Sequence, residues 1–456
     1  MHSSLSDPAR LPRAAAAWLV LMPALLLSAC GGGSGAAPGD APTITQFSSD
    51  RTSYFVGDKA RLAVNYRGGT GRIEPGVGPV ASGTVVETPV LDRAVSYRLV
   101  VDGAGKSVSQ SLALPVDFRD RYVTLDVAFV SSDHAAVTTG DGAVLILGGS
   151  RGQNTLSDSI DRFDPATRRF TRIGSLRTGR GGHTATRLPD GHVLVVGGVS
   201  SLQIGNVADL VDERSGAVSH GGDLAQPRNW HATTLLADGR VLVTGGYGRN
   251  TAEIWDPATN AWRVVAARMA HMRWHHTATL LGDGRVLIAG GQSEGTAYQF
   301  AELFDPRSET FAPLASSGIG MRRLHAAHRL GDGSVLILGG ETLAPDGGIV
   351  RLASVLRFDP AANRFADAPP LATARTLMRS IALPDGRVLL FGGETPAAQP
   401  SASGEVYAAA KGGQARAPMV GERMLHSVSR LPDGRVLVVG GEGAGGAYLP
   451  QVLLYE

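Results

Sequence analysis

The chain has 456 residues, of which 43% are hydrophobic and only 18% charged, and its 60 glycines favour short strands and tight turns over long charged helices. Its length exceeds what one ordinary core needs, so we expect several domains or a repeat architecture. The 43 Lys and Arg residues balance 41 Asp and Glu residues without long runs of one sign, which disfavours a nucleic-acid partner. The single cysteine, Cys30, excludes an intramolecular disulfide framework and a cysteine-rich zinc site.

Residues 1–29 have the pattern of an export signal. Arg10 and Arg13 precede an apolar stretch over residues 14–27 that Pro23 interrupts. A helix of that length spans about 21 Å, whereas the hydrocarbon core of a membrane is about 30 Å thick. The stretch therefore favours a cleaved signal over a membrane-spanning helix.

The signal ends in Leu27-Ser28-Ala29-Cys30, which resembles the lipobox of bacterial lipoproteins. This resemblance implies cleavage before Cys30 and acylation of Cys30, and two or more acyl chains make a stable anchor. A glycine at position 31 implies transfer to the outer membrane. We therefore expect a lipid-anchored protein that has the membrane as a partner and faces either the periplasm or the cell surface. The alternative is an ordinary secretory signal with an incidental cysteine.

Two segments separate the signal from the rest of the chain. Residues 30–41 are rich in Gly, Ala and Pro, which predicts a flexible tether. Residues 42–117 alternate polar and apolar side chains in runs such as 60–66 and 96–100, which predicts a small antiparallel β-sandwich. The length and pattern of this segment resemble immunoglobulin-like modules of bacteria, without their paired cysteines or core tryptophan. We expect it to act as a spacer.

From residue 118 to residue 456 the chain repeats itself. The sequence HTATRLPDGHVLVVGG at 183–198 returns with small changes six more times, and successive Gly-Gly pairs lie 45 to 53 residues apart. This pattern is similar to Kelch repeats, which implies an all-β fold with a seven-bladed propeller of four-stranded blades. The other copies occupy 134–149, 231–246, 276–291, 325–340, 378–393 and 426–441.

Each part of the repeat has a mechanical role. We expect Asp-Gly to form a two-residue type I′ turn between the two inner strands, and Gly-Gly to end the second strand where the chain packs closely. Asp-Pro, as at Asp164-Pro165, predicts the turn between the third and fourth strands. The last repeat stops after its third strand, so we expect residues 121–127 to pair with it and close the ring.

Six repeats place an arginine three residues before the histidine position. A ring of such side chains is suited to binding an anionic sugar, but a residue present in nearly every blade more often serves the blade itself. We therefore interpret the ring as structural, and because no acidic residue recurs beside it we expect no metal site. Blade six carries Met378 in place of histidine. The ring consists of Arg180, Arg228, Arg273, Arg322, Arg375 and Arg423, with His183, His231, His276, His325 and His426.

Residues that break the repeat are better candidates for a binding site, because binding residues usually vary on a rigid scaffold. They cluster in the loops after Gly-Gly and between blades, and aromatic side chains there are suited to stacking on sugar rings. Packing between blades is the alternative role. The candidate ligand-binding residues are Arg228, Trp230, Tyr247, Arg249, Arg273, Trp274, His275, Glu294 and Tyr298.

These observations leave three hypotheses for the function. We favour a non-enzymatic envelope protein that presents the propeller to a glycan or protein partner. A periplasmic epimerase or mutarotase acting on acidic sugars is the second, and it needs an acid–base residue beside an arginine; Glu294, Glu341, Glu394 and Glu442, just after Gly-Gly, are candidates. A galactose-oxidase-like copper enzyme is the third. It is disfavoured because its Cys–Tyr copper site needs a cysteine that the repeats lack, so we expect no cofactor.

Overall fold

The computed structural model describes residues 40–152, 155–200, 203–293, 296–297, 300–314 and 318–456. The predicted signal, Cys30 and most of the tether lie outside these residues, as do Glu294 and Tyr298. Within the described part of the chain, no helix is both long and apolar enough to cross a membrane. The one helical turn is η1 (Ala444–Gly446), so the all-β prediction is confirmed for the described residues.

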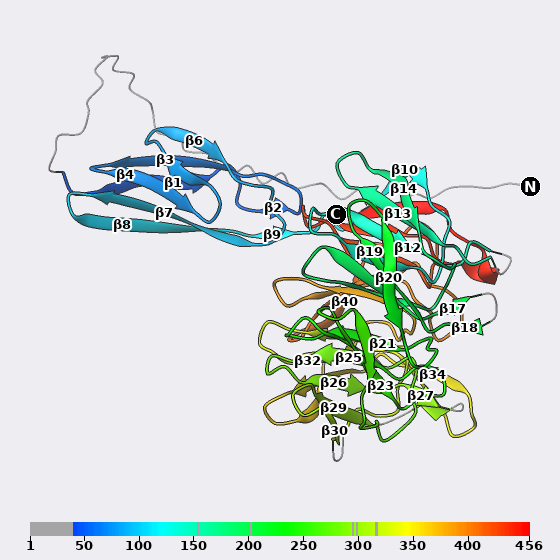
Figure 1. Ribbon diagram of the computed structural model, residues 1–456. Coiled ribbons are helices and arrows are strands. Elements are labelled where there is room, and N and C mark those ends of the chain that lie inside the picture. The colour runs from blue at the N-terminus through cyan, green and yellow to red at the C-terminus, as the bar shows by residue number, and fades with distance from the viewer. Residues whose placement is uncertain (1–39, 153–154, 201–202, 294–295, 298–299, 315–317) are drawn as a thin grey trace, which may run out of the picture.

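Two sheets form the N-terminal module. One contains β1 (Thr43–Ser49), β3 (Arg61–Arg67) and β6 (Thr84–Glu87), and the other has the order β5 (Gly78–Val80), β4 (Thr70–Glu74), β7 (Val95–Gly103) and β8 (Lys106–Leu114). Alternate residues of β3 and β7 point inward, so Leu62 and Leu99 meet in one buried core. A short parallel pair, β2 (Tyr54–Phe55) with β9 (Val116–Asp117), lies at the propeller end (Figure 1). The immunoglobulin-like resemblance stays a prediction.

The described residues from 122 to 455 form seven antiparallel four-stranded sheets, which we call blades 1 to 7. Their first strands contact one another in a closed circuit, β11 to β15 to β21 to β25 to β31 to β37 to β41 and back to β11, so the sheets surround one axis as a β-propeller. Blade 1 contains β11 (Ala135–Thr138), β12 (Val144–Leu147), β13 (Ser159–Asp164) and β14 (Arg169–Ser175). Blade 2 contains β15 (Thr184–Arg187), β16 (His192–Val196), β19 (Val207–Asp212) and β20 (Val218–Asp223). Blade 3 contains β21 (Ala232–Leu235), β22 (Val241–Thr244), β23 (Ala252–Asp256) and β24 (Ala261–Val264).

The remaining blades follow the same plan. Blades 4 to 6 contain β25 (Thr277–Leu280), β26 (Val286–Ala289), β29 (Ala301–Asp305) and β30 (Thr310–Pro313); β31 (Ala326–Arg329), β32 (Val335–Leu338), β35 (Val355–Asp359) and β36 (Arg364–Ala368); and β37 (Arg379–Ala382), β38 (Val388–Phe391), β39 (Gly404–Ala408) and β40 (Gly412–Arg416). Blade 7 contains β41 (Ser427–Arg430), β42 (Val436–Val439) and β43 (Gln451–Tyr455), with β10 (Tyr122–Ala128) as its outer strand.

The second strand of each blade is almost entirely apolar because both of its faces are buried between neighbouring blades. Across the turn between the third and fourth strands, paired aromatic rings add to this packing. The centroids of Phe304 and Phe311 are 4.9 Å apart, and Phe304 packs into a cluster with Leu242 and Ile254 of the preceding blade. The blades are therefore joined by apolar contacts rather than covalent links.

The Asp-Gly hairpins differ from the predicted two-residue type I′ turn. In the hairpin of blade 2 only Gly191 has a positive φ, +89°, and the Leu188 carbonyl accepts a hydrogen bond from the Gly191 N–H. The Leu188 N–H in turn donates to the His192 carbonyl, so the loop has three residues and ends in a glycine bulge. Asp190 keeps a negative φ because its carboxylate accepts the N–H of His192, 3.0 Å away.

The Gly-Gly pair is required by close contacts between blades. A Cβ on Gly197 would lie 2.4 Å from the Arg228 carbonyl and 2.9 Å from Cε1 of His231, both in the next blade. A Cβ on Gly198 would lie 2.9 Å from Cβ of His183 in its own blade. Both glycines also have positive φ values. The pair therefore marks the place where the second strand ends against its neighbours.

The propeller has two unlike faces. The Asp-Gly hairpins lie on one, the hairpin face, and the loops that follow Gly-Gly and link the blades lie on the other, the loop face. Three small hairpins mark the loop face: β17 (Val199–Ser200) with β18 (Gln203–Ile204), β27 (Gln292–Ser293) with β28 (Thr296–Ala297), and β33 (Glu341–Leu343) with β34 (Ile349–Arg351). In Figure 1 they point away from the N-terminal module.

The N-terminal module docks on the hairpin face at blades 6 and 7. Arg387 forms a salt bridge of 2.9 Å with Asp117, and Arg430 forms one of 2.7 Å with Asp92. Apolar residues on both sides belong to one core cluster, which includes Val56 of the module and Val436 of blade 7. The module therefore leaves the loop face uncovered (Figure 1).

Candidate functional site

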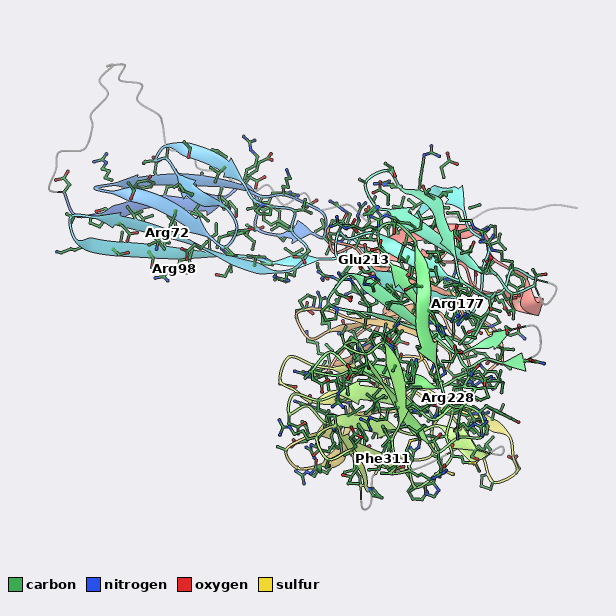
Figure 2. The ribbon with its side chains drawn as sticks, viewed as in Figure 1. Arg72, Arg98, Arg177, Glu213, Arg228 and Phe311 are labelled. Atoms are coloured by element: carbon green, nitrogen blue, oxygen red, sulfur yellow. The ribbon has the colours of Figure 1, made fainter. Side chains whose placement is uncertain are left out.

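The arginine ring lies inside the blades. Arg228, labelled in Figure 2, is fully buried, and its Nη1 donates to the carbonyls of Gly245 at 2.6 Å and Thr251 at 3.0 Å. Its Nη2 forms a buried salt bridge of 2.9 Å with Glu253. Arg273 is equally buried and pairs with Glu302. The prediction that Arg228 and Arg273 bind a ligand is therefore wrong, because both side chains hold the end of the second strand to the third strand of their own blade.

The other four arginines occupy the same position. Arg180 and Arg375 pair with Asp209 and Glu405, whereas Arg322 and Arg423 form no salt bridge with an acidic residue in the described part of the chain. Burial lowers the pKa of these last two guanidinium groups to about 10, so they stay charged at neutral pH.

The histidines of the repeat join neighbouring blades. Nε2 of His231 lies 2.9 Å from the Thr184 hydroxyl of the preceding blade, and Nε2 of His325 lies 2.9 Å from that of Thr277. Burial lowers the pKa of His134, His183, His231 and His325 to about 3, so their rings are neutral at physiological pH. His276 and His426 are also buried, with their pKa values lowered in the same direction.

The residue just before each histidine position forms a ring around the axis on the loop face, which we call the axial ring. Each member has a left-handed backbone, with φ between +51° and +63°. The N–H of His275 donates to the Trp230 carbonyl at 3.1 Å, and the N–H of Leu324 donates to the His275 carbonyl at 3.1 Å. The repeated backbone geometry is structural, so the differences lie in the side chains. The members are Asp133, Gly182, Trp230, His275, Leu324, Leu377 and Leu425.

Aromatic side chains gather at blades 3 and 4, where they form what we call the aromatic patch: Trp230, Tyr247, Trp274 and His275. The ring centroid of Trp230 lies 4.9 Å from that of His275, and the centroid of Tyr247 lies 4.9 Å from that of Trp274. Trp230 and Tyr247 are 41% and 53% exposed, whereas Trp274 is buried beneath them. Burial lowers the pKa of His275 to about 4, so its ring is uncharged. The patch brings four predicted ligand-binding residues together.

Further apolar and cationic groups border the patch. Met272, Phe300 and Met321 are exposed on the loop face, and the Phe300 ring stacks on His271 with centroids 4.6 Å apart. Arg249, another predicted site residue, lies two residues after Tyr247 and is part-buried, and its buried Nε has no hydrogen-bond partner among the residues that the structure describes. Exposed apolar side chains grouped in this way are typical of a binding surface.

Two candidate functional residues, Asp133 and Arg379, were missed by the sequence interpretation. Asp133 in the axial ring is the only acidic member, and burial raises the pKa of its carboxyl to about 6, although the nearby Arg379 guanidinium opposes this rise. A Cβ on Gly182 would lie 3.5 Å from Oδ2 of Asp133 and 3.3 Å from Nε1 of Trp230, so the glycine leaves space between these two groups. The break at Met378, which precedes Arg379, was the signal in the sequence.

Acidic residues that follow Gly-Gly are mostly paired. Glu341 forms a salt bridge of 2.7 Å with Arg323, and Glu394 forms one of 2.5 Å with Arg351. Glu442 accepts a 2.5 Å hydrogen bond from Ser132. These contacts lie on the loop face, and the Arg323–Glu341 pair adjoins the aromatic patch, because the charge of Arg323 acts on His275.

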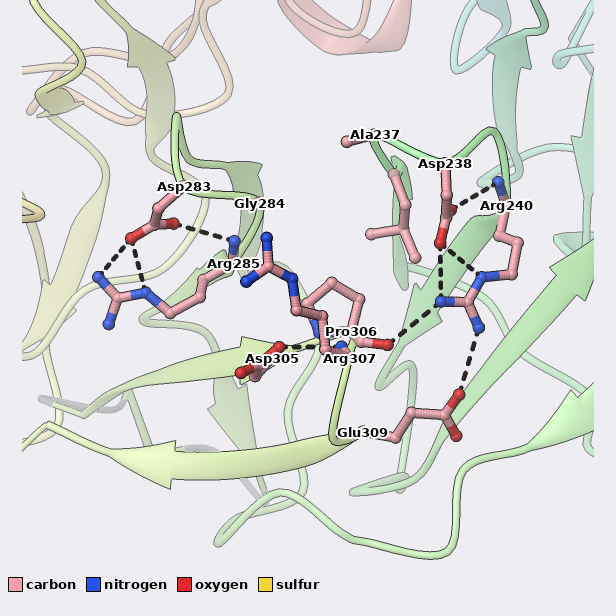
Figure 3. Close-up of a pocket in the computed structure, with 11 residues that line it drawn as sticks. Ala237, Asp238, Arg240, Asp283, Gly284, Arg285, Asp305, Pro306, Arg307 and Glu309 are labelled. Carbon is pink, nitrogen blue, oxygen red and sulfur yellow. Dashed lines mark hydrogen bonds and ion pairs between the residues drawn. The ribbon is translucent and has the colours of Figure 1, made fainter.

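A cavity of about 610 Å³ lies on the hairpin face, between blades 3 and 4. Figure 3 shows Arg240 reaching from Asp238 to Glu309, and Arg285 turned back onto Asp283. The charged side chains that line this cavity are thus mostly paired with one another. It contains none of the predicted site residues.

The described residues form a β-propeller, and one of its blades matches a known family model. The family model described as Kelch motif matches residues 133–177, which cover blade 1. A solved structure titled "Novel fungal alcohol oxidase with catalytic diversity among the AA5 family, in complex with copper" is 15% identical, with a TM-score of 0.60 over 74% of this chain and 75% of that chain. The structure of YjhT is 15% identical, with a TM-score of 0.45 over 72% of this chain and 96% of that chain. No curated protein sequence gives a significant match.

Likeness at this identity shows the fold alone, so the copper of the fungal oxidase needs a separate test against the residues present here. Three of the seven axial-ring residues are leucines, and the repeat histidines are turned into contacts between blades. In the part of the chain that the structure describes, no three His, Cys, Asp or Glu side chains gather as metal ligands. The donor set therefore does not fit a copper centre of that kind.

Proposed function

We propose that the protein is a cell-envelope lipoprotein whose Kelch propeller binds a glycan through the aromatic patch of its loop face. The observation that carries the proposal is the exposure of Trp230 and Tyr247, which pack against half-buried His275 and buried Trp274, respectively. Aromatic faces held rigidly from below bind flat, partly apolar ligands such as sugar rings with little loss of side-chain entropy. Neighbouring polar groups supply hydrogen bonds for the hydroxyls.

The position of the N-terminal module supports an orientation in which the loop face points away from the membrane anchor. Asp40, the first described residue, lies near the turn at Gly68, at the end of the module remote from the propeller. An anchor at Cys30 would therefore hold the molecule by that end and leave the loop face pointing away from the module (Figure 1). The proposed location is the outer membrane, facing either the periplasm or the exterior. A protein partner on the same face is the alternative occupant.

The experiment is glycan-array binding by residues 40–456, compared with Trp230→Ala and Tyr247→Ala. We expect each substitution to weaken binding about tenfold or more, because an exposed aromatic anchor commonly contributes at least ~1.4 kcal/mol. Phe55→Ala removes an aromatic ring of similar exposure from the module and is the matched control. Unchanged binding by both patch variants would refute the proposed site. A silent array would favour a protein partner, to be sought by crosslinking in the envelope.

One observation favours an enzymatic alternative, a mutarotase or epimerase of acidic sugars. Such an enzyme needs an acid–base group whose pKa is close to neutral beside a cationic side chain, and Asp133 with its pKa of about 6 near Arg379 has these properties. The test is NMR of anomeric exchange or epimer formation for any sugar that binds. Turnover that Asp133→Asn abolishes while binding persists would establish this alternative, and binding without turnover would exclude it for that sugar.

A further inference from the structure

Arg379 differs from its counterparts in every other blade. It is the first residue of β37, the innermost strand of blade 6, and the equivalent positions hold small side chains. In blades 2, 4 and 7 the equivalent residue has a hydroxyl that hydrogen-bonds to the histidine ring of an adjacent blade. A long cationic side chain here is not needed for the blade to form. The six equivalents are Ala135, Thr184, Ala232, Thr277, Ala326 and Ser427.

The Arg379 side chain reaches beyond its own blade. Its Nε donates to the His426 carbonyl of blade 7 at 2.8 Å. Its charge also acts on Asp133 and His134, which belong to blade 1, two blades away. Neighbouring first strands line the axis, so Arg379, at the start of one of them, lies close to the axis.

The two Nη atoms of Arg379 form no hydrogen bond or salt bridge with any residue that the structure describes. The charge of Asp133 acts on the Arg379 guanidinium, yet the two side chains form no salt bridge. This contrasts with Arg180, Arg228, Arg273 and Arg375, whose Nη groups are fully engaged by carboxylates and carbonyls. A part-buried guanidinium whose two Nη atoms have no partner among the described residues is suited to bidentate binding of a planar anion.

We propose that Arg379 is a carboxylate-binding residue near the propeller axis on the loop face, where it binds the carboxylate of a uronic-acid unit of a glycan or of a free organic acid. The charge of Arg379 acts on Asp133, and Gly182 leaves space between Asp133 and Trp230 of the aromatic patch. The glycan form of the inference rests on the proposed function, since it places the rest of the sugar on that patch. The carboxylate site itself rests on Arg379 alone.

The test is calorimetric binding of three probes to residues 40–456: methyl glucuronide, methyl glucoside, which has a neutral hydroxymethyl group in place of the carboxylate, and lactate. We expect the glucuronide to bind about tenfold or more tightly than the glucoside, as a charge-assisted pair commonly contributes. Arg379→Thr, a side chain that the repeat itself carries at Thr184 and Thr277, should remove this preference without unfolding the protein. Arg61→Thr, at an exposed position in the module, is the control for loss of one positive charge.

The outcomes separate the two proposals. Equal binding of glucuronide and glucoside, or an Arg379→Thr variant that keeps the preference, overturns the carboxylate site and leaves the glycan function standing. Binding of lactate and glucuronide through Arg379, with binding unaffected by Trp230→Ala, supports the carboxylate site and refutes the aromatic glycan site. If Arg379→Thr is unstable, Arg379→Lys decides the matter, because it keeps the charge but loses the planar fork and should lose most of the preference. Full retention by that variant also overturns the inference.

Discussion

Tyr122 lies directly opposite Tyr455 in the antiparallel pairing of β10 with β43, and the centroids of their rings are 5.0 Å apart. The two strands come from opposite ends of the propeller sequence, so this pair closes the ring of blades. Phe118 and Phe391 pack on the same Tyr455 ring, with centroids 5.1 Å and 5.6 Å from it. Closure therefore joins the linker from the module, blade 6 and blade 7 in one aromatic cluster.

We predict that Tyr455→Ala destabilises the whole propeller, because the ring is fully buried and its removal leaves a cavity at the closure. The expected loss is about 3–5 kcal/mol in the free energy of unfolding, measured from urea denaturation. Val264→Ala, at an exposed position on the outer strand of blade 3, should change stability by less than about 0.5 kcal/mol. Similar losses for the two variants would show that β10 and β43 do not hold the ring closed.

A second prediction concerns the buried arginine ring. Arg228→Ala should destabilise the protein by about 3–5 kcal/mol, because it leaves the carboxylate of Glu253 buried without its partner. The double variant Arg228→Met with Glu253→Leu should recover much of that loss, since it removes both charges and keeps apolar volume. Thermal unfolding measures both variants. A single variant that stays fully stable but loses ligand would restore Arg228 to the binding site.

The sequence was most informative where the fold repeats and least where it does not. Gly-Gly and the apolar second strands identified the propeller because their causes, close contact and burial on both faces, act in every blade. Arg228 was placed at the surface because a sequence motif gives position but not depth, and its side chain is buried. Arg379 was missed for a related reason. Its importance depends on which side chains surround the axis, and those come from blades far apart in the sequence.

The turn chemistry shows a smaller limit of the same kind. Asp-Gly alone suggests two residues with positive φ, yet Asp190 caps its own turn and only Gly191 adopts that conformation. The preceding Pro189 fits the first position of a type I turn, and this residue was the local signal for the longer loop. Local patterns therefore fixed the place of each hairpin more reliably than its geometry.

A third prediction follows from the buried histidines. The pKa of His183 is lowered from 6.5 to about 3 by burial, so between these values the folded state binds fewer protons than the unfolded state. Stability is therefore fully present above pH 6.5 and falls as the pH is lowered toward 3. His183→Met, the substitution that blade 6 carries naturally at Met378, removes this titration.

We expect wild-type protein to lose stability with acidification faster than His183→Met, by about 1 kcal/mol per pH unit below pH 6. Denaturant midpoints at pH 7, 6, 5 and 4 give the comparison. His220→Met is the control because His220 is exposed on β20. Parallel pH profiles for wild type and His183→Met would show that this ring is not held in its neutral form.

The last prediction concerns the pH dependence of carboxylate binding at Arg379. Burial raises the pKa of Asp133 from 3.8 to about 6, so its carboxyl is mostly neutral at pH 5 and ionised at pH 7.5. Ionised Asp133 repels a carboxylate bound to Arg379 and competes for the guanidinium. Methyl glucuronide should therefore bind more tightly at pH 5 than at pH 7.5, by about fivefold for ~1 kcal/mol of repulsion.

The other charged or titratable groups near Arg379 and Asp133 leave this expectation intact. His134, with a pKa of about 3, and His426, whose pKa is lowered in the same direction, remain neutral throughout that range, and Glu442 is hydrogen-bonded to Ser132. Asp133→Asn should bind the glucuronide at pH 7.5 as tightly as wild type binds it at pH 5, and its affinity should vary little between the two. Calorimetry with methyl glucoside at both pH values is the control. A wild-type affinity that falls on acidification, or an Asp133→Asn variant that keeps the full pH dependence, would exclude Asp133 as the titrating group.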